Sequence, residues 1–134
     1  MAGTLVADQL QDGAGNSTSM DNAIYGSAKA WVRFAGSTGT IAGSYNVSSI
    51  TRTSTGYYTV NFTNAMSNAN YTANVNASGN GSVFAGSCGI FSDTGGNAVA
   101  PTTSSFKFTT AANGGSTTSI TVMDATYVSV VVLD

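Results

Sequence analysis

The sequence predicts an all-β fold, and three of its features support that prediction. Ser, Thr, Asn and Gly make up 65 of the 134 residues, whereas Glu, a residue that favours helices, does not occur. Thr, Val, Tyr and Phe recur in short runs that turn-forming residues separate. Several runs alternate apolar and polar residues, the period that places neighbouring side chains on opposite faces of a strand. We expect an antiparallel sandwich or a jelly-roll-like barrel of about eight to ten strands.

The first 27 residues are mostly polar and are predicted to form an arm, while residues 28–134 form a β-sandwich head. A short strand is expected from Leu5 to Leu10, followed by a turn or flexible joint at residues 12–17. The anchor of this arm on another protein is expected at Leu5, Val6 and Ala7. A frayed terminus is the alternative. We expect neither a signal peptide nor a transmembrane span, because no apolar run is long enough.

The clearest strand patterns lie between residues 26 and 62, which also hold the only tryptophan, Trp31. Residues 28–35 and 56–63 carry aromatic and β-branched residues between Gly, Ser and Thr clusters. Residues 44–51 are predicted to form a third strand, with Tyr45 and Val47 on one face and a bulge near Ser48 and Ser49. The alternation in residues 56–63 predicts that the inward-facing side chains are Tyr58, Val60 and Phe62.

Five more strands are expected in the second half of the sequence, at residues 70–77, 82–91, 105–110, 119–124 and 125–133. The first of them is expected to form a hairpin with residues 56–63. Residues 93–105 form a long loop of the kind that often carries binding residues. The last strand is apolar on both faces, so both must be covered. We therefore expect a homotrimer whose interface contains Val128, Val130 and Val132.

The residues available for chemistry argue against an enzyme. Without His or Glu, a general acid and base could come only from six Asp residues. A Ser–Lys pair using Lys29 or Lys107 would lack any recognisable nucleophile turn. We expect no cofactor and no metal ion, although a calcium site at Asp93 or Asp124 is an alternative. The net charge of −2 and the largely uncharged surface argue against nucleic-acid and membrane partners.

Recognition of another molecule is the function class that remains. Trp31 shares its strand face with Lys29 and Arg33, so its ring is expected at a subunit contact or at the edge of the core, with a ligand platform as the alternative. Exposed aromatic rings and amide side chains can bind sugar hydroxyls, although a simply solvated strand face would have the same composition. The residues predicted to contact a receptor are Trp31, Tyr57, Asn97 and Asn113.

Three ordered motifs in this block also resemble a segment found in bacteriophage fibre and related virion proteins. They are AKAWVRF at 28–34, SYNVSSIT at 44–51 and GYYTVNF at 56–62. The resemblance implies a β-rich protein of the virion surface, often trimeric and at or near a fibre tip, made in the host cytoplasm. Two functions stay open. One is a small fibre or fibre-tip protein that attaches to a host polysaccharide or protein, and the other is a capsid decoration or head-fibre protein without a receptor-binding role.

Overall fold

The computed structural model describes residues 3, 6–20, 23, 26–79, 87–113 and 120–133. Within these residues it contains eleven β-strands. They are β1 (Gln9–Gln11), β2 (Ser17–Ser19), β3 (Ala30–Ala35), β4 (Ile41–Tyr45), β5 (Val47–Ser54), β6 (Tyr57–Phe62), β7 (Thr72–Ala77), β8 (Ser87–Ile90), β9 (Ser105–Asn113), β10 (Ile120–Val122) and β11 (Tyr127–Leu133). No helix in this part of the chain is long and apolar enough to cross a membrane.

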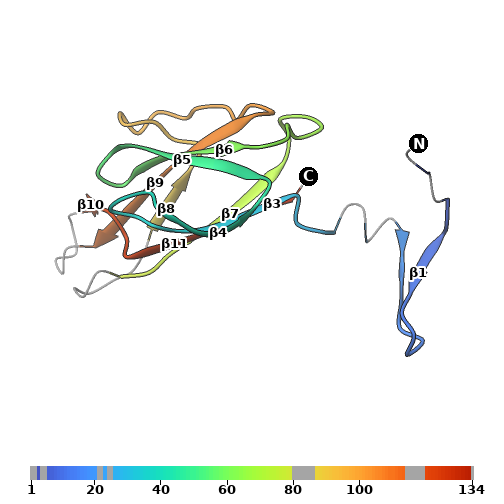
Figure 1. Cartoon of the computed structure of the whole chain (residues 1–134). Helices are drawn as coiled ribbons and strands as arrows, with labels where there is room; N and C mark the ends of the chain where they lie inside the picture. The colour runs from blue at the N-terminus through green and yellow to red at the C-terminus, as the bar shows by residue number, and fades with distance from the viewer. Residues whose placement is uncertain are drawn as a thin grey trace.

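Strands β3 to β11 form two antiparallel sheets that pack face to face as a sandwich (Figure 1). One sheet has the strand order β10-β9-β6-β5, and β8 pairs with β9 beside it. The other has the order β4-β3-β11-β7. All pairings are antiparallel. The prediction of an all-β antiparallel sandwich is therefore confirmed.

The hydrophobic core lies between the two sheets and is built mainly from alternating residues of β3, β6, β7, β9 and β11. Its centre is a set of packed aromatic rings. The ring centroids of Phe34 and Tyr58 are 5.3 Å apart with an edge-to-face geometry, and those of Tyr58 and Phe108 are 5.2 Å apart and stacked. The inward-facing residues expected in residues 56–63 are all buried. A period of two along each strand thus places one face of each sheet in the core.

The predicted strand at residues 44–51 is wrong in one respect, because the chain changes sheets within it. Tyr45 ends β4 in one sheet and Val47 begins β5 in the other. Tyr45 is consequently 59 % exposed while Val47 is 8 % exposed, so the two do not share a face. Asn46 makes the change of direction with a φ of 53°, a left-handed conformation that Asn tolerates. The predicted bulge is present, since the β5–β6 register shifts between Val47 and Ser49.

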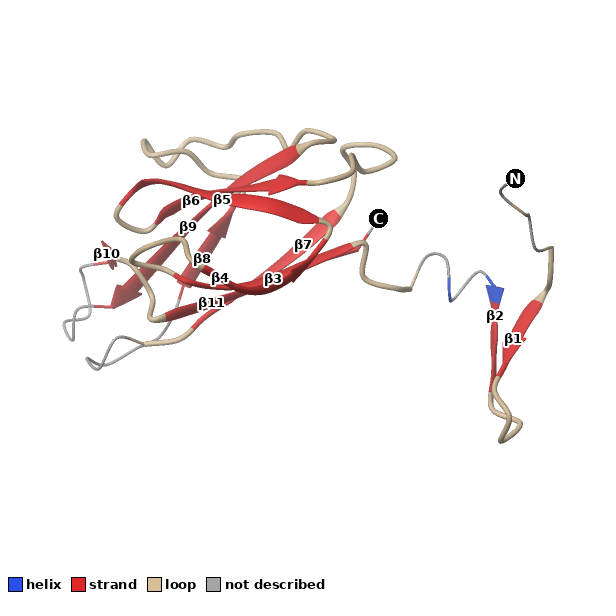
Figure 2. Ribbon diagram, in the orientation of Figure 1, coloured by secondary structure: helices blue, strands red, loops and turns tan. Residues whose placement is uncertain are grey.

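The predicted hairpin between residues 56–63 and 70–77 is also wrong. β6 pairs with β5 and β9, whereas β7 pairs with β11 in the opposite sheet. The intervening segment crosses from one sheet to the other (Figure 2). Both strands carry buried apolar residues on alternate positions, and placing them in opposite sheets lets those faces meet across the core.

The trimer interface predicted at Val128, Val130 and Val132 must be corrected. These three side chains are at most 1 % exposed and belong to the core of the single chain. β11 lies in the interior of its sheet, between β3 and β7, and the second sheet covers the valine face. The uncovered face of β11 carries Tyr127, Val131 and Leu133, which are 41–50 % exposed.

The N-terminal arm contains a small hairpin, β1–β2, in which Gln9 pairs with Ser19 and Gln11 with Ser17. Figures 1 and 2 show this hairpin apart from the sandwich. The expected strand begins later than predicted, at Gln9, and Leu5 lies outside the described residues. Val6 is 91 % exposed and precedes the strand. The role of this arm as an anchor stays a prediction.

Candidate functional site

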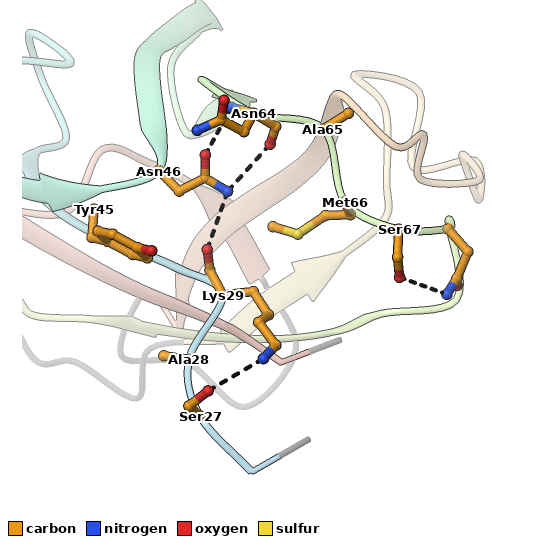
Figure 3. Close-up of a pocket in the computed structure, with 10 residues that line it drawn as sticks. Ser27, Ala28, Lys29, Tyr45, Asn46, Asn64, Ala65, Met66 and Ser67 are labelled. Atoms are coloured by element: carbon orange, nitrogen blue, oxygen red, sulfur yellow. Dashed lines mark hydrogen bonds between the residues drawn. The ribbon is translucent and has the colours of Figure 1, made fainter. Parts of the chain in front are cut away.

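An open groove of about 630 Å³ lies at the end of the sandwich where the arm joins β3 (Figure 3). Three segments that are distant in sequence form its walls: residues 27–29 before β3, residues 45–46 between β4 and β5, and residues 64–68 after β6. The groove has the size of ordinary small-ligand sites, which typically measure roughly 300–1,000 Å³.

Asn46 holds the walls of the groove together (Figure 3). Its side-chain amide Nδ2 donates to the carbonyl oxygens of Lys29, at 3.1 Å, and Asn64, at 3.2 Å. Its Oδ1 accepts a hydrogen bond of 2.7 Å from the backbone N–H of Asn64, and its own carbonyl accepts one of 3.2 Å from Thr63. One amide side chain thereby joins the residue before β3, the β4–β5 corner and the loop after β6.

The surface of the groove mixes apolar and polar groups and, among the described residues, carries a single charge. Its lining includes the aromatic ring of Tyr45, the buried thioether of Met66 and several amides and hydroxyls, and Lys29 is the only ionic residue among them. The Lys29 ammonium donates to Ser27 Oγ at 3.2 Å. An aromatic ring beside amides and one cation can bind a polar chain that is neutral or bears a carboxylate. Among the described residues, the lining contains no carboxylate to act with Lys29 in acid–base chemistry.

The opposite end of the sandwich contains a second polar cluster, centred on Asp124. Its Oδ2 accepts a hydrogen bond from the Arg52 guanidinium at 2.7 Å. Its Oδ1 accepts from the Tyr58 hydroxyl at 2.7 Å, from the Gly56 N–H at 2.8 Å and from Arg52 Nε at 3.1 Å. The carboxylate is fully used by donors of its own chain, so this cluster closes the fold.

The pKa values of this cluster follow from its contacts. Burial of Asp124 would raise the pKa of the carboxyl, but the hydrogen bonds from Arg52, Tyr58 and Gly56 outweigh it and lower that pKa below 3.8. Burial, together with the acceptor Asp124, raises the pKa of the Tyr58 phenol well above 10. The hydrogen bond to Asp124 raises the pKa of Arg52. At neutral pH the Asp124 carboxylate and the Arg52 guanidinium are thus ionised, and the Tyr58 phenol keeps the proton that it donates to Asp124.

Two short turns have nearly the same geometry, in DGAGN at 12–16 and DTGGN at 93–97. In each, Oδ1 of the Asp accepts N–H hydrogen bonds from the second and fourth following residues, at 2.8 to 2.9 Å. The Asn side chain closes the turn on the Asp carboxylate, and a glycine with φ of 88° or 74° precedes the Asn. The shared pattern was visible in the sequence but was not recognised there.

These contacts bear on the calcium alternative at Asp93 and Asp124. Asp93 and Asp124 both have carboxylates that already accept hydrogen bonds from their own chain. In the described ranges, no three of His, Cys, Asp and Glu gather as metal ligands would. Calcium binding at either residue stays an untested alternative.

The four residues predicted to contact a receptor do not form one site. Trp31 lies on the outer face of β3, and Tyr57 is half-buried on the outer face of β6 in the other sheet, beside a cavity of about 80 Å³. Asn97 closes the turn on Asp93. Asn113 ends β9, and its side chain lies outside what the structure describes. These residues lie on separate surfaces, and their role in receptor binding stays a prediction.

Sequence reasoning did not predict the roles of the two residues that organise the ends of the sandwich, Asn46 and Asp124, although it named Asp124 as an alternative calcium ligand. Asn46 continues the alternation between Tyr45 and Val47, so the local pattern gives no signal of a corner there. Asp124 has no local signal, because its partners Arg52 and Tyr58 lie 72 and 66 residues away. No protein-family model, curated protein or solved structure matches this chain. The site must therefore be interpreted from its own geometry.

Proposed function

We propose that this chain is a bacteriophage virion surface protein, a small homotrimeric fibre or fibre-tip protein that takes part in host attachment. The arm docks on another virion protein, and the sandwich projects from it. The observation that carries this proposal is that residues 27–29, where the arm meets β3, line the groove. Figure 1 shows the arm leaving the sandwich at this end. This end of the sandwich thus has two surfaces, the arm and the groove, that can bind a partner protein.

The arm has the properties of a segment that needs a partner. Its hairpin contains three residues in each strand, and Leu10 within it is 43 % exposed. A two-stranded hairpin is marginally stable in water by itself, because it buries little apolar surface. A neighbouring protein that pairs with β1 or covers Val6 and Leu10 would supply the missing contacts.

The groove extends the same docking end. Lys29 and the Asn side chains on its rim offer donors and acceptors that match the polar groups of a peptide segment, and Tyr45 offers a flat apolar surface. Lys29 gives this surface a positive charge, so we expect the docked segment to carry a carboxylate. The opposite end of the sandwich, where β9 ends at Asn113, would then face the host.

The location of the chain in the particle tests this proposal. A density map of the virion should show the sandwich at the tail or fibre, with residues 1–27 against another protein. Density confined to capsid symmetry axes or capsomer junctions would favour decoration over host attachment. Absence of the chain from the particle would overturn the virion assignment.

A pair of charge reversals tests the docking end separately. Lys29→Asp should reduce incorporation of the protein into particles, because it replaces the groove's cation by an anion. Lys107→Asp makes the same change in charge on the exposed outer face of β9 and should leave incorporation unchanged. Equal incorporation of both variants would contradict docking through the groove.

A further inference from the structure

Exposed apolar side chains are concentrated on one surface of the sandwich. Seven large apolar residues are exposed in the described part of the chain, and Val6 and Leu10 of the arm are two of them. The other five lie on the outer side of the β4-β3-β11-β7 sheet. We call this surface the Trp31 face, and its members are Trp31, Tyr45, Tyr127, Val131 and Leu133. The outer side of the opposite sheet has no counterpart among the described residues.

The sheet register makes part of this face continuous. Trp31 pairs with Tyr45 on β4 and with Val131 on β11, so the three side chains form a row across three strands. The indole of Trp31 lies over Gly43, where a Cβ would be 3.5 Å from the ring. A Cβ at that distance would be in ordinary van der Waals contact with the ring, so the indole packs against β4 at this position. Trp31 is nevertheless 42 % exposed.

The charge of the Trp31 face favours a second copy of the chain over a charged partner. Arg33 is the one charged residue within these four strands, and its guanidinium carbon lies 4.9 Å from the centroid of the Tyr127 ring. The remaining outward positions carry hydroxyl and amide groups, including Ser129, Asn74 and Asn76. Identical faces of this kind can approach one another with little repulsion between like charges.

The area also suits an interface. Five side chains that are 41–59 % exposed leave on the order of 500 Å² of accessible surface. This value lies within the roughly 300–600 Å² of the largest apolar patch on a typical monomer, a patch that is often functional. With the polar rim of β7 and β11, the Trp31 face approaches the roughly 800 Å² per partner of a stable interface.

From these observations we infer that copies of this chain associate through the Trp31 face. The inference rests on the homotrimer of the proposed function and assigns its contact to a surface different from the buried valines of β11. Trp31 and Val131 occupy its centre, where residues that contribute most to binding are usually found. Tyr45 lies at its edge and also borders the groove, so the two surfaces are contiguous.

The experiment uses Trp31 as its own reporter, because it is the only tryptophan of the chain. At micromolar concentration, light scattering should give the mass of an oligomer. The Trp31 emission should be blue-shifted and protected from acrylamide, and dilution should reverse both effects. A monomer whose Trp31 is readily quenched would overturn the inference, and this measurement requires no variant.

Two variants locate the contact. Val131→Asp places a charge at the centre of the Trp31 face and should raise the dissociation constant at least roughly 30-fold, with the strand signal in circular dichroism retained. Thr51→Asp is the matched control on the outer side of β5, where a carboxylate can still accept the hydrogen bond from Asn61. It should remain oligomeric.

The outcomes separate this inference from the proposed function. A trimer that persists in Val131→Asp, with Trp31 still protected, would overturn the Trp31 face and leave the homotrimer intact. A dimer that Val131→Asp dissociates would support the Trp31 face and contradict the trimer. A trimer that the substitution dissociates would support both.

Discussion

The two ends of the sandwich are closed in different ways, and the difference indicates where function can reside. β6 runs from one end to the other, with Gly56 and Tyr58 near the Asp124 cluster and Phe62 near the groove. At the first end the Asp124 carboxylate accepts hydrogen bonds from three residues, and one of them, Arg52, also forms an ion pair with it. At the second, the neutral side chain of Asn46 makes three hydrogen bonds.

The charged end is saturated and tightly packed. Every oxygen of Asp124 has donors within its own chain, and Gly56 is surrounded closely by β10 and β9. The neutral end spaces its three segments apart and leaves a groove between them. The saturated Asp124 carboxylate leaves nothing for a ligand, whereas the groove beside Asn46 leaves space where an external partner can bind.

The largest expected effect comes from Gly56→Ala at the charged end. A Cβ on Gly56 would lie 2.6 Å from Val122 Cγ1 and 2.7 Å from the Thr110 carbonyl oxygen, and its φ of 71° disfavours a side chain. The two costs together should lower the free energy of unfolding by about 2–5 kcal/mol. Chemical denaturation followed by circular dichroism would measure this change.

Gly96→Ala is the control for Gly56→Ala. Gly96 has a similar φ of 74°, but a Cβ there meets no atom within 4 Å. Only the backbone cost remains, so we expect a loss of about 1–2 kcal/mol. Equal losses for both variants would show that close packing around Gly56 is unimportant, which would contradict the contrast between the ends.

The second prediction removes the carboxylate itself. Asp124→Ala should lower the free energy of unfolding by about 3 kcal/mol, because it leaves the buried Tyr58 hydroxyl and the Gly56 N–H without their acceptor. The ion pair adds less, since the Arg52 side chain is 31 % exposed. Thermal unfolding of the variant beside the unchanged chain would measure the loss. A change below 1 kcal/mol would mean that the cluster does not close this end.

The same carboxylate gives stability a defined pH dependence. The pKa of Asp124 is lower in the folded chain than its usual value of 3.8, so the ionised form is favoured by folding. This contribution is fully present above the unfolded pKa and is lost as pH falls through the folded pKa. Unfolding measured between pH 6 and about pH 2 should show a decline in the unchanged chain that is smaller in Asp124→Asn. An identical slope in both would assign the acid sensitivity to other groups.

The third prediction concerns the neutral end and is smaller. Asn46→Gly keeps a residue that tolerates φ of 53° but removes the three side-chain hydrogen bonds, which should cost about 1–3 kcal/mol. Asn46→Ala adds the backbone cost, so it should be less stable than Asn46→Gly by about 1 kcal/mol. The opposite order of stabilities would show that the left-handed corner is not what requires Asn here.

Sequence reasoning succeeded where the determining pattern was local. The inward positions of β6, β7 and β9 follow from alternation within six to nine residues, and the structure buries them. The pairing partners of these strands depend on contacts between distant residues, so the hairpin of β6 with β7 was predicted wrongly. The sequence showed that β11 is apolar on both faces, but it did not show which face the second sheet covers.

The candidate site was harder to predict because it is assembled from three separate segments. Lys29, Asn46 and Asn64 meet at a position that no sequence spacing indicates. Asn97 was selected as a receptor contact from its place in a long loop, and the structure uses its side chain to close a turn. The side chain of a polar loop residue can hydrogen-bond to its own chain as readily as to a ligand, and only the fold distinguishes these two cases.

The smallest expected effect tests that distinction at Asn97. Hydrogen bonds from the backbone and side chain of Asn97, together with one from Gly95, lower the pKa of the Asp93 carboxyl below 3.8. Asn97→Ala removes only the side-chain contribution, so the pKa of Asp93 should rise towards 3.8 without reaching it, and global stability should change by less than about 1 kcal/mol. Carboxyl titration by nuclear magnetic resonance would measure the shift. Asp12, whose pKa the equivalent Asn16 lowers, is the internal control because its own turn is unchanged. If the pKa of Asp93 stays constant in the variant while host adsorption of particles falls, Asn97 acts on a receptor and not on its turn.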